Sequence, residues 1–161
     1  MSRAIASTRE LYAHALAMER EAVRRYREYE AYFDARGDEV LAGLCRNLAT
    51  LEAQHLAAIG ESARGIELPL EDASGDGPIA SSLEGDGAFR DAVDARQLLE
   101  IALRAECDAL GFFEWVASTS PDETVRSLAQ EMALEEMDHV KWVRDAIEYH
   151  EPSGLQVSAQ E

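Results

Sequence analysis

The second half of this 161-residue chain repeats the pattern of polar and apolar residues found in its first half. Five pairs of residues are separated by 87 positions, namely Leu16 and Leu103, Glu19 and Glu106, Ala22 and Ala109, Val23 and Leu110, and Tyr26 and Phe113. The segment Glu52-Ala53-Gln54-His55-Leu56 aligns in the same way with Glu136-Met137-Asp138-His139-Val140, at an offset of 84 residues. This repeat predicts a duplicated helical hairpin, with equivalent side chains facing each other across a pseudo-two-fold axis.

Four stretches have the composition and apolar spacing of α-helices. We predict helices over residues 8–35, 39–60, 95–117 and 121–149, a Gly- and Pro-containing loop over 64–93, and a flexible tail over 151–161. Gly37 is expected to end the first helix and Asp38 to cap the second. Ser120 followed by Pro121, with Glu123 three positions after Ser120, predicts the start of the fourth helix, with Ser120 as its N-cap.

The short links within each half predict two antiparallel helical hairpins, whereas the connection between the halves is 30 residues long. A helix of about 24 residues is roughly 36 Å long, and 30 extended residues can reach about 100 Å. The connection can therefore cross the whole bundle. The expected fold is a single all-α domain over residues 1–161, an antiparallel four-helix bundle with one long crossover between the second and third helices.

The charge and the cysteine content exclude several classes of protein. The 32 acidic residues against 15 Lys and Arg give a formal charge of −17, which disfavours nucleic acid and anionic membrane as partners and favours cations. We find no apolar run of 18 residues and no signal-like N-terminus, so we expect a cytoplasmic protein. The two cysteines, Cys45 and Cys107, form no Cys-x-x-Cys motif, which argues against a zinc ribbon or a rubredoxin-type iron site.

Six polar residues interrupt the apolar stripes of the predicted helices. One glutamate of the first helix recurs at seven-residue spacing with core aromatics, and its counterpart in the third helix is placed in the same way. The second and fourth helices each carry a Glu-x-x-His motif on the apolar face. The residues predicted to point into the core are Glu19, Glu52, His55, Glu106, Glu136 and His139.

These side chains suit a pair of divalent metal ions. Residues at i and i+3 are neighbours on a helix, so Glu-x-x-His aims two ligands at one centre, and carboxylates can bridge two ions about 3.5–4 Å apart. Mixed oxygen and nitrogen ligands suit iron or manganese, and four carboxylates balance two divalent ions. Burial of the same carboxylates without cations costs several kcal/mol for each. We therefore predict two Fe ions per site, with Mn or a mixed pair as the alternative.

With these motifs, residues 8–149 resemble the rubrerythrin and bacterioferritin branch of the ferritin-like superfamily. The resemblance implies a diferrous centre that reacts with O₂ or H₂O₂, and hence a peroxidase or a ferroxidase. Rubrerythrins usually carry a further Glu where this chain has Ala109, and their rubredoxin domain is absent here, which implies an external electron donor. Bacterioferritins often carry a haem-ligating Met where this chain has Ala53, so no haem is expected. The lack of a convincing fifth helix after Pro152 argues against a 24-subunit cage.

The sequence leaves other readings open. Iron storage or delivery without a dedicated substrate is one alternative, and a metal-free structural bundle is another. Tyr26 is a candidate catalytic residue, as an electron donor or a hydrogen-bond donor to a ligand, but it is also placed to fill the core. Aromatic residues on more than one face of the third helix, Phe112, Phe113 and Trp115, predict a homodimer. The acidic tail after Pro152 allows an encapsulating shell as a partner.

Overall fold

The computed structural model describes residues 3–68 and 95–149, which form four α-helices. Their bounds are α1 Thr8–Asp34, α2 Glu39–Ser62, α4 Ala95–Thr119 and α5 Glu123–Tyr149. Each bound lies within two residues of its prediction, so the predicted all-α class is confirmed. Residues 64–68 are non-helical as predicted, while the rest of the predicted loop (64–93) and the predicted tail (151–161) lie outside the described residues.

The turn between α1 and α2 follows the prediction. Gly37 has φ of 72°, in the left-handed region that glycine adopts without the steric penalty of a Cβ. The Asp38 N–H then donates to the Phe33 carbonyl at 3.1 Å, and the Asp38 carboxylate accepts from the Leu41 N–H at 3.0 Å. Asp38 therefore closes the turn and caps α2, which aligns α2 antiparallel to α1.

The predicted N-cap of the fourth helix is wrong by two residues. The Asp122 Oδ1 accepts a hydrogen bond from the Val125 N–H at 3.0 Å, which makes Asp122 the capping side chain of α5. The Ser120 Oγ accepts from the Asp122 N–H at 3.2 Å and so orders the turn before the helix. An aspartate nearer to the free N–H groups replaces the serine that the sequence suggested.

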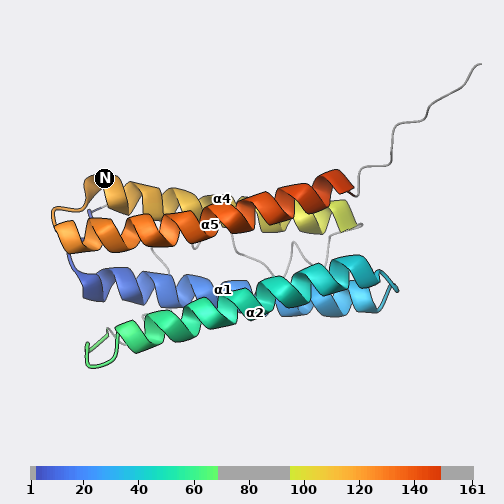
Figure 1. Ribbon diagram of the computed structural model, residues 1–161, viewed down its shortest axis with the longest axis horizontal. Coiled ribbons are helices and arrows are strands. Elements are labelled where there is room, and N and C mark those ends of the chain that lie inside the picture. The colour runs from blue at the N-terminus through green and yellow to red at the C-terminus, as the bar shows by residue number, and fades with distance from the viewer. Residues whose placement is uncertain (1–2, 69–94, 150–161) are drawn as a thin grey trace, which may run out of the picture.

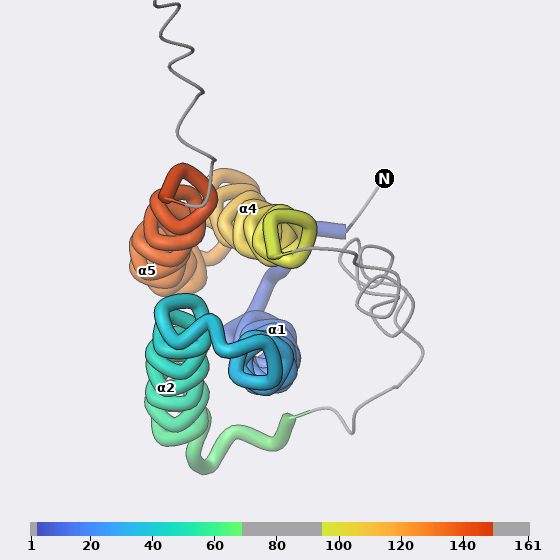
Figure 2. The backbone as a smooth tube through the Cα atoms, turned by 90° about the vertical axis from the view of Figure 1, so that its right-hand side faces the viewer, coloured from blue at the N-terminus to red at the C-terminus, as the bar shows by residue number. Residues whose placement is uncertain are grey.

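The two hairpins pack so that neighbouring helices are antiparallel (Figure 1). The end of α2 and the start of α4 lie at opposite ends of the bundle, and α2 and α4 run in the same direction. Viewed along the bundle, α4 lies over α1 and α5 lies over α2 (Figure 2). This is the topology expected for a bundle in which one connection spans its length.

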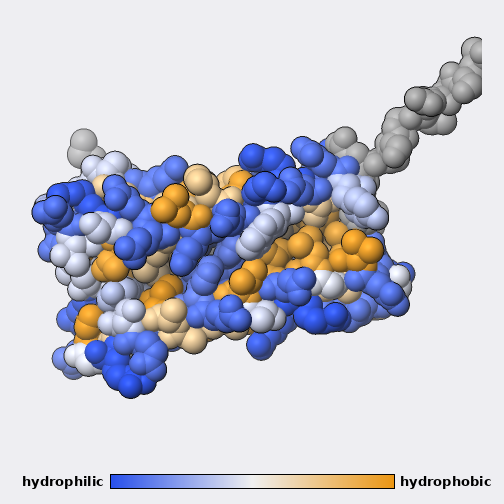
Figure 3. All heavy atoms as spheres, viewed as in Figure 1, coloured by the Kyte–Doolittle hydropathy of each residue, from blue (hydrophilic) through white to orange (hydrophobic). Residues whose placement is uncertain are grey.

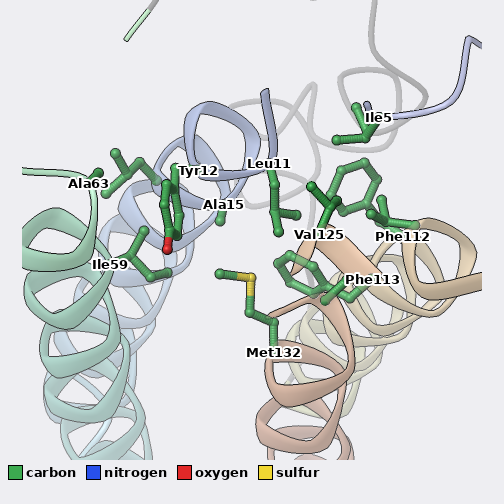
Figure 4. Close-up of a cluster of buried hydrophobic side chains, with 13 residues drawn as sticks. Ile5, Leu11, Tyr12, Ala15, Ile59, Ala63, Phe112, Phe113, Val125 and Met132 are labelled. Carbon is green, nitrogen blue, oxygen red and sulfur yellow. The ribbon is translucent and has the colours of Figure 1, made fainter. Parts of the chain in front are cut away.

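The apolar core is divided into two clusters. The first cluster joins residues of all four helices (Figure 4), among them Leu11, Tyr12, Ile59, Phe112, Phe113, Val116, Val125 and Met132. The second cluster contains Tyr26, Phe33, Leu41, Leu48, Leu98, Leu99 and Val143. On every helix the predicted ligand residues lie in sequence between members of these two clusters. The polar residues therefore form a layer across the bundle, with an apolar cluster on each side.

The aromatic residues of α4 do not supply the partner surface on which the homodimer was predicted. Phe112 and Phe113 are 6% and 0% exposed and pack inside the first cluster, against which Trp115 is also partly buried. On the face formed by α2 and α5, exposed apolar side chains lie along the groove between the helices, surrounded by hydrophilic ones (Figure 3). The homodimer remains a prediction without this support.

None of the helices in the described ranges combines the length and the apolar character needed to cross a membrane.

Candidate metal centre

The six predicted ligands are buried in the middle of the bundle. Glu52, Glu106 and His139 are each 1% exposed, while Glu19 and Glu136 are 4% and 5% exposed. The His55 side chain is 20% exposed, at the edge of the layer. All four helices contribute, because each heptad-spaced stripe turns its single carboxylate or its Glu-x-x-His pair toward the bundle axis.

The imidazole of His139 is the centre of the cluster. Its Nδ1 lies 2.9 Å from Glu52 Oε1, 3.6 Å from Glu136 Oε2 and 3.7 Å from Glu106 Oε2. These carboxylates come from α2, α5 and α4, so one nitrogen atom meets oxygen atoms from three helices. The two halves of the duplicated pattern thus converge on a shared point.

The imidazole of His55 lies beside that of His139. The two rings are stacked, with centroids 5.2 Å apart and planes 10° apart. The His55 Nδ1 is 3.9 Å from Glu52 Oε2 and 4.0 Å from Glu135 Oε2. Glu135 was predicted to be solvated or to lie behind the ligands, and its side chain is 52% exposed. His55 and Glu135 therefore form the side of the centre that is open to solvent.

Five of the six predicted residues fall into two sets whose ligand atoms lie within 4.8 Å of one another, Glu52 with His55 and His139, and Glu106 with Glu136 and His139. Glu19 belongs to neither set, although its carboxylate adjoins that of Glu52. Each set contains three atoms that can hold one divalent ion. The pairing of His139 with both sets was not evident from the sequence, since it depends on how the helices face each other.

Several of these atoms have no hydrogen-bond partner. Within residues 3–68 and 95–149, the unpartnered buried atoms include Glu19 Oε2, Glu52 Oε1, His55 Nδ1 and His139 Nδ1. Glu52 Oε1 and His139 Nδ1 are close together, yet they do not have the geometry of a hydrogen bond. Buried polar atoms normally find partners, and these four surround one small volume. The ligand set and its orphaned lone pairs fit a pair of metal ions.

The carboxylates can share this volume only if positive charge enters it, as protons or as metal ions. Burial, and then the neighbouring Glu52 and Glu136, raise the pKa of Glu19 to about 10. Burial likewise raises the pKa of Glu136 to about 8, helped by Glu106 and Glu52 and opposed by His139. Burial alone would lower the pKa of His139, but the three carboxylates around it raise that pKa to about 12.

Glu106 differs from the other carboxylates because two donors from α1 hold it. The Tyr26 hydroxyl donates to Glu106 Oε1, and the Arg25 guanidinium contacts the same oxygen through Nη2 at 3.1 Å. Burial would raise the pKa of Glu106, but His139, Arg25 and Tyr26 together lower it to about 2. The hydrogen-bonding role predicted for Tyr26 is therefore present, in a residue that is also part of the second apolar cluster.

Arg25 was not singled out in the sequence. It is 7% exposed, whereas the adjacent Arg24 forms exposed ion pairs with Glu21 and Glu28. Burial would lower the pKa of Arg25, but Glu106 and other nearby acidic groups keep it above its ordinary value, so the guanidinium is charged. The available signal was its position three residues after Ala22, on the inward face of α1.

These pKa values predict how metal stabilises the protein at different pH. Glu19, Glu136 and His139 bind protons more tightly in the folded chain, so the metal-free protein loses stability as the pH rises above the pKa values of the unfolded chain. Metal ions bind more tightly at higher pH, because they replace those protons. We expect the difference in melting temperature between metal-loaded and chelated protein to grow by roughly 5 °C or more from about pH 5.5 to pH 8. A difference that is constant or shrinks over this range would contradict the assignment.

The fold has a counterpart among solved structures. It is similar to the crystal structure of an uncharacterized conserved protein from Magnetospirillum magnetotacticum MS-1, with a TM-score of 0.71 and 24% identity. The alignment covers 89% of this chain and 95% of that chain. No protein-family model matches the sequence, and no curated protein matches it. The comparison supports the four-helix fold over nearly the whole length of both chains.

Proposed function

We propose that the protein is a di-iron oxidoreductase that reduces H₂O₂ or O₂ at the Glu and His layer of its bundle. The carrying observation is that ligand atoms from all four helices converge in a buried volume, where four of them have no hydrogen-bond partner among the described residues. The resemblance to rubrerythrins and bacterioferritins supports iron as the metal.

The residues that would hold the ions are divided between the two hairpins. Glu52 and His55 from α2 and Glu136 and His139 from α5 supply the paired ligands. Glu19 and Glu106 supply one carboxylate each from α1 and α4. In the reaction with peroxide, two Fe(II) ions each give up one electron, and H₂O₂ takes up two electrons and two protons to form two water molecules.

The chain contributes geometry, charge and a dry environment to this reaction. Tyr26 and Arg25 fix Glu106 through one oxygen, which leaves its Oε2 directed toward His139. The two apolar clusters keep bulk water from both ends of the layer. Tyr26 is the residue that we propose to support turnover directly, because its hydroxyl contacts a ligand.

A separate protein or small molecule is proposed to return electrons to the centre. The 161-residue chain has only two cysteines, of which Cys45 is buried and Cys107 is exposed on another helix. These residues do not provide a rubredoxin-type iron site, which needs four thiolates. Repeated reduction of peroxide by this chain would therefore draw on an external electron donor.

Stopped-flow mixing tests the proposal. The protein loaded anaerobically with two equivalents of Fe²⁺ is mixed with H₂O₂ and, separately, with O₂, and the formation of Fe(III) is followed by absorbance. We expect at least one oxidant to react roughly 100-fold faster than with free Fe²⁺ in the same buffer, a modest share of the acceleration typical of enzymes. A faster reaction with peroxide identifies a peroxidase, and a faster reaction with O₂ identifies a ferroxidase. Oxidation no faster than in buffer would contradict both.

A further inference from the structure

A small cavity adjoins the candidate metal centre between α1 and α4. Its volume is about 30 Å³, which is room for about two water-sized molecules. Three alanines, Ala22, Ala105 and Ala109, provide much of its wall, and Met18 and Asp108 complete it where it approaches solvent. Its inner end is lined by Arg25 and by the carboxylates Glu19, Glu52, Glu106 and Glu136.

The cavity lies on the pseudo-two-fold axis of the duplicated fold. Six of its lining residues form three pairs separated by 87 positions, namely Met18 and Ala105, Glu19 and Glu106, and Ala22 and Ala109. A molecule in this cavity therefore faces both halves of the metal centre. The position equivalent to Arg25 is Phe112, which is buried in the first apolar cluster. Arg25 thus places a positive charge on one side of an otherwise symmetric cavity.

Arg25 has a donor that the described protein does not use. Its Nη2 contacts Glu106, but its Nε has no hydrogen-bond partner within the two described ranges. The side chain is only 9% exposed, so water in bulk does not satisfy this N–H. A buried charged donor without a partner is unfavourable, and it lies in the wall of a cavity that can hold a small acceptor.

The charge balance indicates which kind of acceptor fits. Four glutamates and Arg25 carry a total of −3, and two divalent ions add +4, so the buried layer has a net charge of +1 with neutral imidazoles. One small monoanion would neutralise it. Asp108 lies at the partly exposed end of the cavity, where solvent screens its charge.

We propose that this cavity is a binding subsite for a small monoanionic oxygen ligand, of the size of hydroxide or hydroperoxide, held by the Nε–H of Arg25. The subsite rests on the proposed di-metal function and specifies its substrate class. Arg25 acts as a positioning residue for the ligand in addition to its contact with Glu106. The three alanines limit the ligand to about two non-hydrogen atoms within the enclosed part, and a longer rod-like anion extends toward the open end.

Azide binding to the Co²⁺-loaded protein tests the subsite without turnover. Wild type, Arg25→Met, Arg25→Lys, Ala109→Leu and Tyr26→Phe are loaded with Co²⁺, and the metal content of each is measured. Azide is then titrated against the visible Co²⁺ absorption to obtain Kd. Ala109→Leu fills the cavity but retains the charge, whereas Tyr26→Phe removes the other donor to Glu106 but leaves the cavity unchanged.

We expect Arg25→Met and Ala109→Leu each to weaken azide binding roughly tenfold or more, as the loss of a charge-assisted hydrogen bond implies. Arg25→Lys retains the charge and is expected to retain part of the affinity, and Tyr26→Phe should remain within about twofold of wild type. Wild-type azide affinity in Ala109→Leu, or in Arg25→Met with two Co²⁺ bound, would overturn the subsite and leave the metal centre intact. A wild type that binds no Co²⁺ would overturn the metal centre and the subsite together.

Discussion

The double variant Glu52→Ala with Glu136→Ala is expected to lose stoichiometric metal binding. Glu52 and Glu136 each belong to one of the two ligand sets, so each set falls from three ligand atoms to two. Metal content should decrease from about two ions per chain to less than about 0.2, since dropping a ligand from each set weakens binding at least tenfold. The measurement is elemental analysis after incubation with Fe²⁺ or Mn²⁺ and gel filtration.

The same variant should be at least as stable as wild type when both are metal-free. Its two substitutions remove buried like charges from the layer around His139, which the protein otherwise accommodates by binding protons. The matched control is Glu131→Ala with Glu148→Ala, which removes two exposed carboxylates from α5. We expect the control to bind metal as wild type does. Equal metal content in all three proteins would contradict the assigned ligands.

Phe113→Ala should have the opposite pattern, with a large loss of stability and no loss of metal sites. Phe113 is 0% exposed and lies in the first apolar cluster with residues of the other helices. Truncation of a buried phenylalanine costs about 3–5 kcal/mol, because apolar contacts are lost and a cavity is left. For a chain of this length, that corresponds to a decrease in melting temperature of roughly 10 °C. Thermal unfolding of the chelated protein measures the effect.

A second truncation tests whether both clusters stabilise the bundle independently of the metal centre. Phe33, 1% exposed in the second cluster, is replaced by alanine in the same way. We expect a comparable decrease in melting temperature and, below that temperature, about two metal ions per chain for both variants. If either truncation left the melting temperature of the chelated protein unchanged, the division of the core into two stabilising clusters would be wrong.

The helices and the polar layer were predictable because both depend on local spacing. Glycine and proline mark the helix ends, and the positions of Glu52 and His55 relative to their apolar neighbours determine the inward face of α2. The duplicated pattern adds a second copy of the same information for α5. These signals lie within single helices, so no knowledge of the packing between helices was needed.

The features that the sequence did not show depend on packing between helices. The contact of His139 with Glu52 joins α5 to α2, and it follows from the rotation of the helices about their axes. Arg24 and Arg25 are adjacent in the sequence, yet only Arg25 meets a carboxylate of another helix in the core. Phe112 was assigned to a partner surface because its own helix already had a core stripe, but the first cluster is wide enough to bury it.

Anomalous diffraction from crystals grown with Fe²⁺ or Mn²⁺ tests the central claim most directly. We expect two peaks about 3.5–4 Å apart among Glu19, Glu52, His55, Glu106, Glu136 and His139, with the ions contacting carboxylates of both hairpins. Metal-replete crystals without a peak in this layer, or with ions bound only at exposed carboxylates, would show that the convergence of these side chains does not constitute a metal centre.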